Sequence, residues 1–419
     1  MCGGVALALI LACPAPGTAQ SVPTGPFTTA GGRLTLSGEA SASIATSDPG
    51  YFNYSNYDSE LTQEVRVDAT AALRLGRRLT LLADLRLQAP LGEGSWSVRP
   101  YALFVRVRPW TDRAFDVQAG LIPPVFGAFS RRAYGTDNPL IGYPLAYQYL
   151  TSLRSDAMPA SANDLLAARG HGWETAYPVG GTAVNSGLPL VDGLRYPVGV
   201  EVRVGNRPVE VSAALTTGSL SSPRLTGSGV GSQLSAHVTV YPTTGLVLGA
   251  SASRGRYLER SVLDALGLKT QGPQASGGDP QASDEGARDT QQAFGFDAEF
   301  SRGHWIVRAE GVFSRWEIPR VQPPLIDGPI SAFAIDAEAR YRIRPGLYAA
   351  VRVGRLDFSD VTGSSGPEAW EAPVRRVEAG AGFSWFRNVT VKGACQWNWR
   401  DTLYNRTEGL ASAQVIVAF

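Results

Sequence analysis

The last ten residues, Leu410 to Phe419, constrain the fold of this chain more than any other segment. They read Leu-Ala-Ser-Ala-Gln-Val-Ile-Val-Ala-Phe and end on an aromatic residue. Successive side chains of an extended strand point to opposite faces. One face therefore carries only apolar residues, namely Phe419, Val417, Val415, Ala413 and Ala411. The other face carries Ala418, Ile416, Gln414 and Ser412, so the chain ends in a strand with one apolar and one more polar face.

The same period-two alternation recurs along most of the chain. It is clearest in the segments 64–75, 79–87, 101–108 and 333–342. Each of these has an apolar face and a charged face, and the sequence offers no helices that could cover the apolar faces of a soluble sheet. Lipid outside a closed barrel and water inside it satisfy both faces at once. The pattern therefore predicts an all-β transmembrane antiparallel β-barrel rather than a soluble sandwich.

Bulk composition does not contradict a barrel. The mean hydropathy is −0.07 and the formal net charge is +1, values that suit a soluble chain. This average is misleading for a barrel because only alternate residues of each strand meet lipid. Past residue 20, no apolar run approaches the roughly 18 to 20 residues that a membrane helix needs. A helical membrane protein is therefore excluded.

The connections between the predicted strands alternate between short and long. Short ones fall at 76–77, 109–113, 205–206, 242–245, 302–303, 344–345 and 387–388; long ones fall at 47–60, 90–96, 123–195, 219–229, 259–291, 318–329, 360–373 and 402–408. Counting the segments between them predicts about 16 strands, the first near 32–46 and the last at 409–419. Because this number is even, both termini lie on the same side of the membrane.

The terminal strand ending in Phe419 and this pattern of turns resemble the outer-membrane β-barrels of Gram-negative bacteria. The architecture resembles that of the general porins in particular. The resemblance implies a location in the bacterial outer membrane, with short turns in the periplasm and long loops outside. It implies that Phe419 is the signal read by the barrel assembly machinery. The implied partners are outer-membrane lipid, lipopolysaccharide, small hydrophilic solutes and, as porins often form trimers, other copies of the chain; nucleic acid has no role.

Aromatic residues near the predicted strand ends support a membrane location, because barrels carry aromatic girdles at both interfaces. They are Tyr101, Trp110, Trp305, Tyr341, Trp385, Trp397 and Trp399. The alternative is a set of ordinary buried aromatics in a soluble core.

The N-terminus is predicted to be a secretory signal peptide, residues 1–19, cut after about Ala19. An apolar stretch from Val5 to Ala12 precedes small and polar residues, although the usual basic start is missing. A rival interpretation makes Cys13 a lipidation site. Residues 20–31 would then form a short N-terminal periplasmic segment, and residues 32–419 the barrel.

The third long connection, residues 123–195, is far longer than the others. Connections of this length are usually functional or disordered, and its many aromatic residues favour a folded one. Ser161 is expected to cap a short helix, with Asp164 at the third helical position and Gly170 after the last turn. In the general porins the third loop folds inward and narrows the barrel, so the resemblance implies the same here. A hairpin within 171–195, which would raise the count to about 18 strands, is the alternative.

The charged residues of this loop are the candidates for lining the constriction. They are Arg131, Arg132, Asp137, Arg154, Asp156, Asp164, Arg169, His171 and Glu174. The alternative for each is a place at the outer mouth of the barrel.

The predicted inward faces of the strands carry nearly equal numbers of cations and anions. The main lumen-wall candidates are Arg66, Arg86, Arg106, Arg108, Asp297, Glu299, Asp336, Glu338, Arg340 and Arg342. Arginine is in surplus on the second to fourth strands, and acidic residues gather on the tenth to twelfth. This distribution suggests a transverse field that orients dipolar solutes; salt bridging along the wall is the alternative.

Motifs for other chemistry are weak. The spacing of His171, His237 and His304 gives no readable metal site, and no cofactor is expected. Passive diffusion of small hydrophilic solutes through a porin-like channel is the predicted function, without catalysis. The alternatives are a structural or adhesive barrel plugged by the long loop, and a barrel-rim hydrolase that uses Ser235 with His237.

Overall fold

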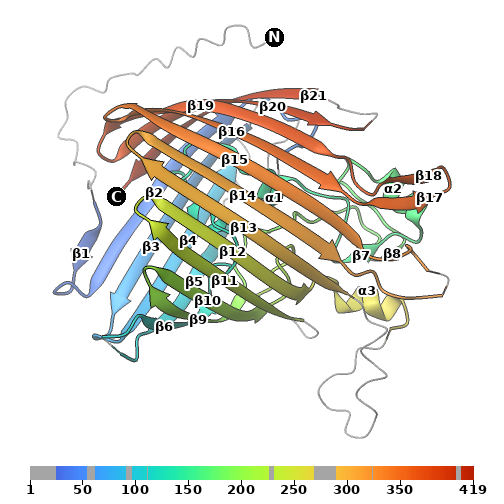
Figure 1. The fold of residues 1–419 in the computed structure, drawn as a ribbon, viewed down its shortest axis with the longest axis horizontal. Helices are drawn as coiled ribbons and strands as arrows, with labels where there is room; N and C mark the ends of the chain where they lie inside the picture. The colour runs from blue at the N-terminus through green and yellow to red at the C-terminus, as the bar shows by residue number, and fades with distance from the viewer. Residues whose placement is uncertain are drawn as a thin grey trace, which may run out of the picture.

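The protein is a closed antiparallel β-barrel, seen here in a computed structural model (Figure 1). The structure describes residues 25–53, 62–90, 97–110, 112–225, 231–268, 289–322, 324–402 and 407–419. Of the 17 strands in the main sheet, 16 form the wall, and β1 (Phe27–Thr29) is a short addition that pairs only with β2. The predicted count of about 16 strands is confirmed, and the predicted signal peptide, residues 1–19, lies outside the described residues.

The wall strands follow one another around the barrel in chain order. They are β2 (Leu34–Ala45), β3 (Thr62–Arg74), β4 (Leu79–Pro90), β5 (Ser97–Val107), β6 (Phe115–Leu121), β9 (Val198–Asn206), β10 (Val209–Thr217), β11 (Ser232–Thr243), β12 (Leu246–Arg256), β13 (Thr290–Arg302), β14 (Trp305–Trp316), β15 (Ile330–Arg344), β16 (Leu347–Phe358), β19 (Val374–Phe386), β20 (Val389–Arg400) and β21 (Thr407–Ala418).

The first and last wall strands close the barrel. β2 and β21 pair in register from Glu39 opposite Ala418 to Ala45 opposite Ser412. Phe419 extends this ladder, because its backbone N–H donates to Gly38 O and Gly38 N–H donates to Phe419 O, each at 2.9 Å. Closure removes the unpaired edges that an open sheet would expose to lipid.

The outer surface of the wall is apolar, as the alternation predicts. Exposed side chains on it include Leu103, Leu215, Leu234, Phe294, Phe296, Phe333 and Val353. Of the predicted girdle aromatics, Trp110, Trp305, Tyr341, Trp385 and Trp399 are exposed. A barrel with an apolar exterior and a polar interior is suited to a lipid bilayer, so the wall spans a membrane.

Tyr101 departs from the predicted pattern. We expected its side chain on the lipid face, but it is 2% exposed and points inward. The ladder between β4 and β5 shifts register between Asp84 and Leu85, which pair with Ala102 and Pro100. This irregularity inserts one residue and reverses the facing of Tyr101, as β-bulges do.

The two ends of the barrel differ. Short turns join the strands at one end, and the small elements gather at the other, as Figure 1 shows. These elements are α2 (Ala162–Ala167), α3 (Arg260–Ala265), the hairpin of β17 (Asp360–Gly363) with β18 (Gly366–Ala369), and the pair β7 (Ala157–Met158) with β8 (Val179–Gly180). No helix among the described residues is long and apolar enough to cross a membrane.

Candidate functional site

The connection between β6 and β9 folds into the barrel, as predicted. It contains η1 (Phe129–Arg132), α1 (Leu145–Gln148), β7, α2 and β8. β7 and β8 form a separate two-stranded sheet, and β6 pairs directly with β9 in the wall. The alternative with about 18 strands is therefore wrong, because the segment 171–195 adds no hairpin to the wall. We call residues 123–195 the lumen loop.

The helix predicted within the lumen loop is confirmed. The Ser161 side chain accepts a hydrogen bond from Asp164 N–H at 3.2 Å and so caps α2. Gly170 follows the helix with a φ of +72°, a conformation that suits glycine. Both features depend on local sequence alone, which is why they could be predicted.

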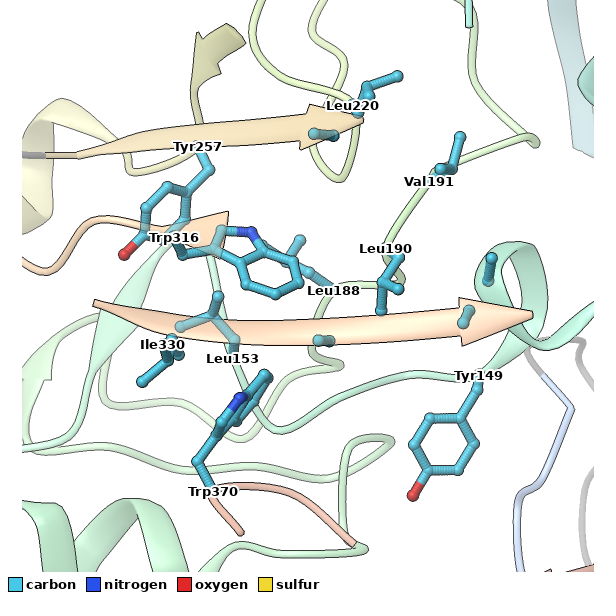
Figure 2. Close-up of a cluster of buried hydrophobic side chains, with 14 of the residues drawn as sticks. Tyr149, Leu153, Leu188, Leu190, Val191, Leu220, Tyr257, Trp316, Ile330 and Trp370 are labelled. Atoms are coloured by element: carbon cyan, nitrogen blue, oxygen red, sulfur yellow. The ribbon is translucent and has the colours of Figure 1, made fainter. Parts of the chain in front are cut away.

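The outer half of the lumen loop packs into a hydrophobic core with the external ends of the strands. Figure 2 shows part of this cluster, in which Trp316 and Trp370 lie near Leu153, Leu188 and Leu190. The ring centroids of Trp316 and Trp370 are 5.8 Å apart and nearly perpendicular. The loop is thus a packed domain of the barrel interior rather than a mobile flap.

A glutamate of the wall holds the start of the lumen loop. Glu310 on β14 accepts hydrogen bonds from the backbone N–H of Ala128 at 3.2 Å and of Phe129 at 3.1 Å, and from the Tyr147 hydroxyl. Gly127 N–H donates to Ser251 Oγ on β12 at 3.0 Å. Gly127 has a φ of +63°, and a Cβ there would lie 2.2 Å from a Glu310 oxygen. Glycine is therefore required at this turn.

The chain then crosses the lumen. Seven residues after Gly127, the Tyr134 hydroxyl donates to Asp84 Oδ2 on β4 at 2.5 Å. β4 and β14 lie eight strands apart in the ring of 16, so they are opposite walls. We call residues 127–134 the crossing segment. It spans the barrel interior as a strut that is bonded at both ends.

The crossing segment places one arginine on each side of itself. Arg131 Nη2 lies 3.8 Å from Glu201 on β9, and Arg132 Nη1 lies 3.7 Å from Glu338 on β15. Burial within the barrel lowers the pKa of Arg131 and of Arg132. The Arg131 side chain is nevertheless 42% exposed, so it faces water inside the lumen.

On the Arg132 side, the loop is tied to the wall by buried charges. Glu39 on β2 accepts from Gly135 N–H at 2.6 Å and from Thr136 N–H at 3.0 Å. Lys392 on β20 donates to the carbonyl oxygens of Gly135 and Asn138.

A second pair of buried wall charges continues this anchorage. Arg352 on β16 donates to Gly142 O and Asn138 Oδ1, each at 2.7 Å. Glu378 on β19 accepts from Gly142 N–H at 2.8 Å. These contacts tie the loop to the wall across the half of the lumen between β15 and β3.

On the Arg131 side, the structure leaves space. A cavity of about 210 Å³ lies beside Arg131; it is lined by Leu82, Asp84, Phe104, Pro123, Tyr134 and Tyr196, among others. Arg106 and Arg203 face the same side of the lumen, and their side chains are 27% and 28% exposed. A second cavity of about 430 Å³ opens nearer the short turns and includes Arg108 and Arg203 in its lining.

Three tyrosines and an arginine lie on the external side of the smaller cavity. The ring centroid of Tyr101 is 4.2 Å from that of Tyr196 and 6.0 Å from that of Tyr134. The Arg86 guanidinium lies 3.7 Å above the Tyr101 ring, within the range of a cation–π contact. Tyr101 also donates to Gly193 O at 2.8 Å. We call Tyr101, Tyr134, Tyr196 and Arg86 the tyrosine cluster.

The predicted constriction residues separate into two groups. Arg131, Arg132 and Asp137 lie at the crossing or just after it, and burial raises the pKa of Asp137. The remaining candidates do not lie there, contrary to our expectation. Arg154 is buried within the loop, where it pairs with Asp156 at 2.8 Å and donates to two backbone carbonyls.

The last candidates lie at the external mouth. Arg169 pairs with Glu368 on β18 at 2.7 Å, and Asp164, His171 and Glu174 line an outer cavity of about 440 Å³. The sequence could not separate these groups, because charge alone does not tell which part of a long loop reaches the lumen.

The predicted lumen-wall residues point inward, but most are paired. Arg66 and Arg86 share Asp68 at 2.8 and 2.5 Å, and Glu338 lies between Arg308 at 3.1 Å and Arg352 at 2.5 Å. Three further pairs of charged side chains are Arg106 with Asp116, His237 with Asp297, and Arg308 with Glu299. Asp336 accepts a hydrogen bond from Leu145 N–H, and the Arg340 guanidinium lies over the Tyr348 ring. Arg342 is exposed near the short turns. Salt bridging along the wall, the alternative to a transverse field, therefore describes most of these charges.

Sequence reasoning missed two of the residues that anchor the loop. Glu39 and Tyr134 were not among the site candidates, yet each bonds the lumen loop to the wall. Glu39 is a lone carboxylate in a strand of small residues, Leu-Thr-Leu-Ser-Gly-Glu-Ala-Ser-Ala-Ser-Ile-Ala. An isolated charge in such a strand is a signal that could have been used.

The predicted Ser235–His237 pair does not form. His237 Nδ1 lies 3.0 Å from Ser251 Oγ, whereas Ser235 Oγ bonds Ser253 Oγ at 2.8 Å. The geometry therefore gives no support to a hydrolase that uses Ser235 with His237. Within the ranges that the structure describes, no group of three or more His, Cys, Asp or Glu side chains could hold a metal ion.

Comparison with solved structures identifies the fold as that of the outer-membrane porins. OmpF of Salmonella typhi, solved in complex with daunomycin, is 13% identical with a TM-score of 0.53, covering 92% of this chain and 97% of that one. The anion-selective porin of Comamonas acidovorans is 11% identical with a TM-score of 0.53, covering 92% and 99%. The outer-membrane channel DcaP of Acinetobacter baumannii is 9% identical with a TM-score of 0.55, covering 94% and 99%. No family model and no curated protein sequence matches the chain.

This protein is therefore a porin-like barrel of the bacterial outer membrane. The likeness extends over nearly the whole described chain, but the low identity carries only the fold. Which solutes the barrel passes depends on the residues that line its lumen.

Proposed function

We propose that the protein is a passive channel for small hydrophilic solutes and that the crossing segment sets its aperture. The observation that carries this proposal is the asymmetry of the lumen around residues 127–134. On one side the loop is tied to the wall by buried charges, whereas on the other side Arg131 faces water beside a cavity. A solute that entered from the short-turn end would reach Arg131 and then the tyrosine cluster.

The charges along this route favour anionic solutes. Three arginines, Arg106, Arg131 and Arg203, face two carboxylates, Asp116 and Glu201, which are more buried than the arginines. The water-facing surface therefore carries an excess of positive charge, which concentrates small anions in a narrow lumen. We expect a modest preference for anions rather than strict selectivity.

A plugged structural barrel is the second candidate. The observation in its favour is that the lumen loop is bonded to opposite walls, at Glu310 on β14 and at Asp84 on β4. The tyrosine cluster also closes the external side of the cavity. In this alternative the barrel passes no solute, and the loop supports the external surface.

Liposome swelling and planar-bilayer recording of the purified protein separate the two candidates. A channel gives discrete conductance steps and swelling with small sugars and organic acids. A plugged barrel gives neither, but gains both when residues 128–194 are replaced by a short glycine–serine linker. A heat-modifiable band on unheated gels checks that the linker variant still forms a barrel.

Arg131→Ala tests the anion preference within the channel proposal. Removing the exposed guanidinium should shift the reversal potential in a salt gradient toward cations. Arg355→Ala is the matched control, because Arg355 is an exposed arginine that pairs with Asp357 near the external end of β16. Equal reversal potentials in both variants would contradict a role for Arg131. The porin resemblance also implies that three copies of the chain associate. Chemical cross-linking of the purified protein in mild detergent tests for such a homotrimer.

A further inference from the structure

The short turns of the barrel are rich in arginine. Taken with the strand residues that flank them, the seven turns carry nine arginines and a single carboxylate, Asp112. The arginines are Arg74, Arg77, Arg78, Arg108, Arg113, Arg207, Arg302, Arg344 and Arg387. They occur in every turn except the one between β11 and β12, so they form a ring around the barrel rather than a patch. We call them the basic rim.

The basic rim is exposed and not neutralised by the protein. All nine side chains belong to exposed residues. Within the part of the chain that the structure describes, none of the nine guanidinium groups lies within 4.0 Å of a carboxylate oxygen. The lumen wall behaves differently, since most of its arginines are paired. Nine arginines without a carboxylate partner gathered at one end of the barrel call for an anion from outside the protein.

Aromatic residues lie next to the rim on the lipid face. Arg302 pairs with Trp305 across the turn between β13 and β14, and Trp305 is 50% exposed. Arg387 follows the exposed Trp385 and Phe386. Arg113 lies 5.5 Å from the Trp110 ring centroid within one turn, where both residues also line the cavity of about 430 Å³. Tryptophan marks the head-group level of a bilayer, so these arginines lie at the level of the lipid phosphates.

We propose that the basic rim binds the phosphate groups of anionic phospholipids in the leaflet that faces the short turns. A guanidinium forms paired hydrogen bonds with a phosphodiester, and a ring of unpaired positive charge favours lipids with a net negative charge over zwitterionic ones. Short turns face the periplasm in barrels of this fold, so the ligand is a phospholipid of the inner leaflet. A single docked acidic protein would need a patch, whereas the arginines surround the barrel as annular lipid does.

This inference is independent of the proposed function, because the rim surrounds an open channel and a plugged barrel alike. The test uses the full mature protein in membranes of equal phosphatidylcholine and phosphatidylglycerol. The protein is extracted with its bound lipid, and the ratio of the two lipids is measured by mass spectrometry. We expect phosphatidylglycerol to be enriched on the order of fivefold over the bulk membrane, and high salt to reduce the enrichment.

The variant that tests the rim combines Arg113→Gln, Arg302→Gln and Arg387→Gln. Its matched control combines Arg320→Gln, Arg355→Gln and Arg375→Gln, three exposed arginines at the opposite end of the barrel. The rim variant should lose most of the enrichment, and the control should keep it. An unchanged lipid ratio in the rim variant, as expected if the rim docks an acidic protein, overturns the proposal. So does an equal loss in the control.

Discussion

Glu310 is the wall residue whose removal should most change the lumen. Its carboxylate is 7% exposed and accepts hydrogen bonds from Ala128 N–H, Phe129 N–H and the Tyr147 hydroxyl. Glu310→Ala removes the acceptor and leaves three donors inside the barrel without it. The strand bonds of β14 stay intact, because they use backbone groups only.

The magnitude follows from the number and kind of these bonds. Each hydrogen bond to an ionised acceptor stabilises by about 1.5–3 kcal/mol. Because the three bonds share one carboxylate and do not add fully, we expect a loss of about 5 kcal/mol in the anchorage of the crossing segment. A loss of this size outweighs the remaining hydrogen bond from Gly127 N–H to Ser251 Oγ. The β14 end of the segment should therefore detach from the wall.

Single-channel conductance in planar bilayers is the assay, with hydrogen exchange of residues 126–134 as a structural readout. Glu310→Ala should raise both the conductance and the exchange rate. Glu299→Ala is the matched control, since Glu299 is an inward carboxylate on β13 whose ion pair is with Arg308 of the wall. Both variants remove one negative charge from the lumen, but only the first removes an anchor. If the two variants conduct and exchange alike, the anchoring role assigned to Glu310 is refuted.

Three further predictions concern other parts of the barrel. Tyr101→Ala should open the tyrosine cluster, raising conductance in bilayers and lowering stability by about 3–5 kcal/mol in chemical unfolding; an unchanged conductance would place the barrier elsewhere. Deleting Phe419 should reduce the heat-modifiable band several-fold in cell membranes, because the terminal ladder to Gly38 is lost, whereas full assembly would show that the residue is dispensable. Burial alone would raise the pKa of Asp156, but hydrogen bonds, chiefly from Arg154, lower it below its usual value of 3.8. The ion pair between Arg154 and Asp156 is therefore fully formed above pH 3.8 and is lost as the pH falls through the lowered pKa of Asp156. In the wild type, hydrogen exchange of residues 151–187 should be faster near pH 2, after correction for intrinsic rates. Asp156→Asn should show no such pH dependence.

Much of the barrel could be predicted because the sequence patterns that specify its strands and turns are local. Alternation within a dozen residues gives each strand its lipid face and its water face, and turn residues mark where strands end. The terminal strand ending in Phe419 and the helix capped by Ser161 depend on neighbours a few residues away. The bulge at Asp84 and Leu85 shows the limit of this reasoning, because one inserted residue turned Tyr101 inward without a sign in the alternation.

By itself, then, the sequence determined a closed wall, the number of its strands and the presence of one long folded loop. Only the tertiary structure decided where that loop crosses the lumen, that Arg131 faces water, and to which half of the wall the loop is tied. Gly127 and Glu310 are separated by 183 positions along the chain, and Tyr134 and Asp84 by 50. Contacts of this range depend on the curvature that brings opposite strands together around one lumen, and no short stretch of residues encodes that distance.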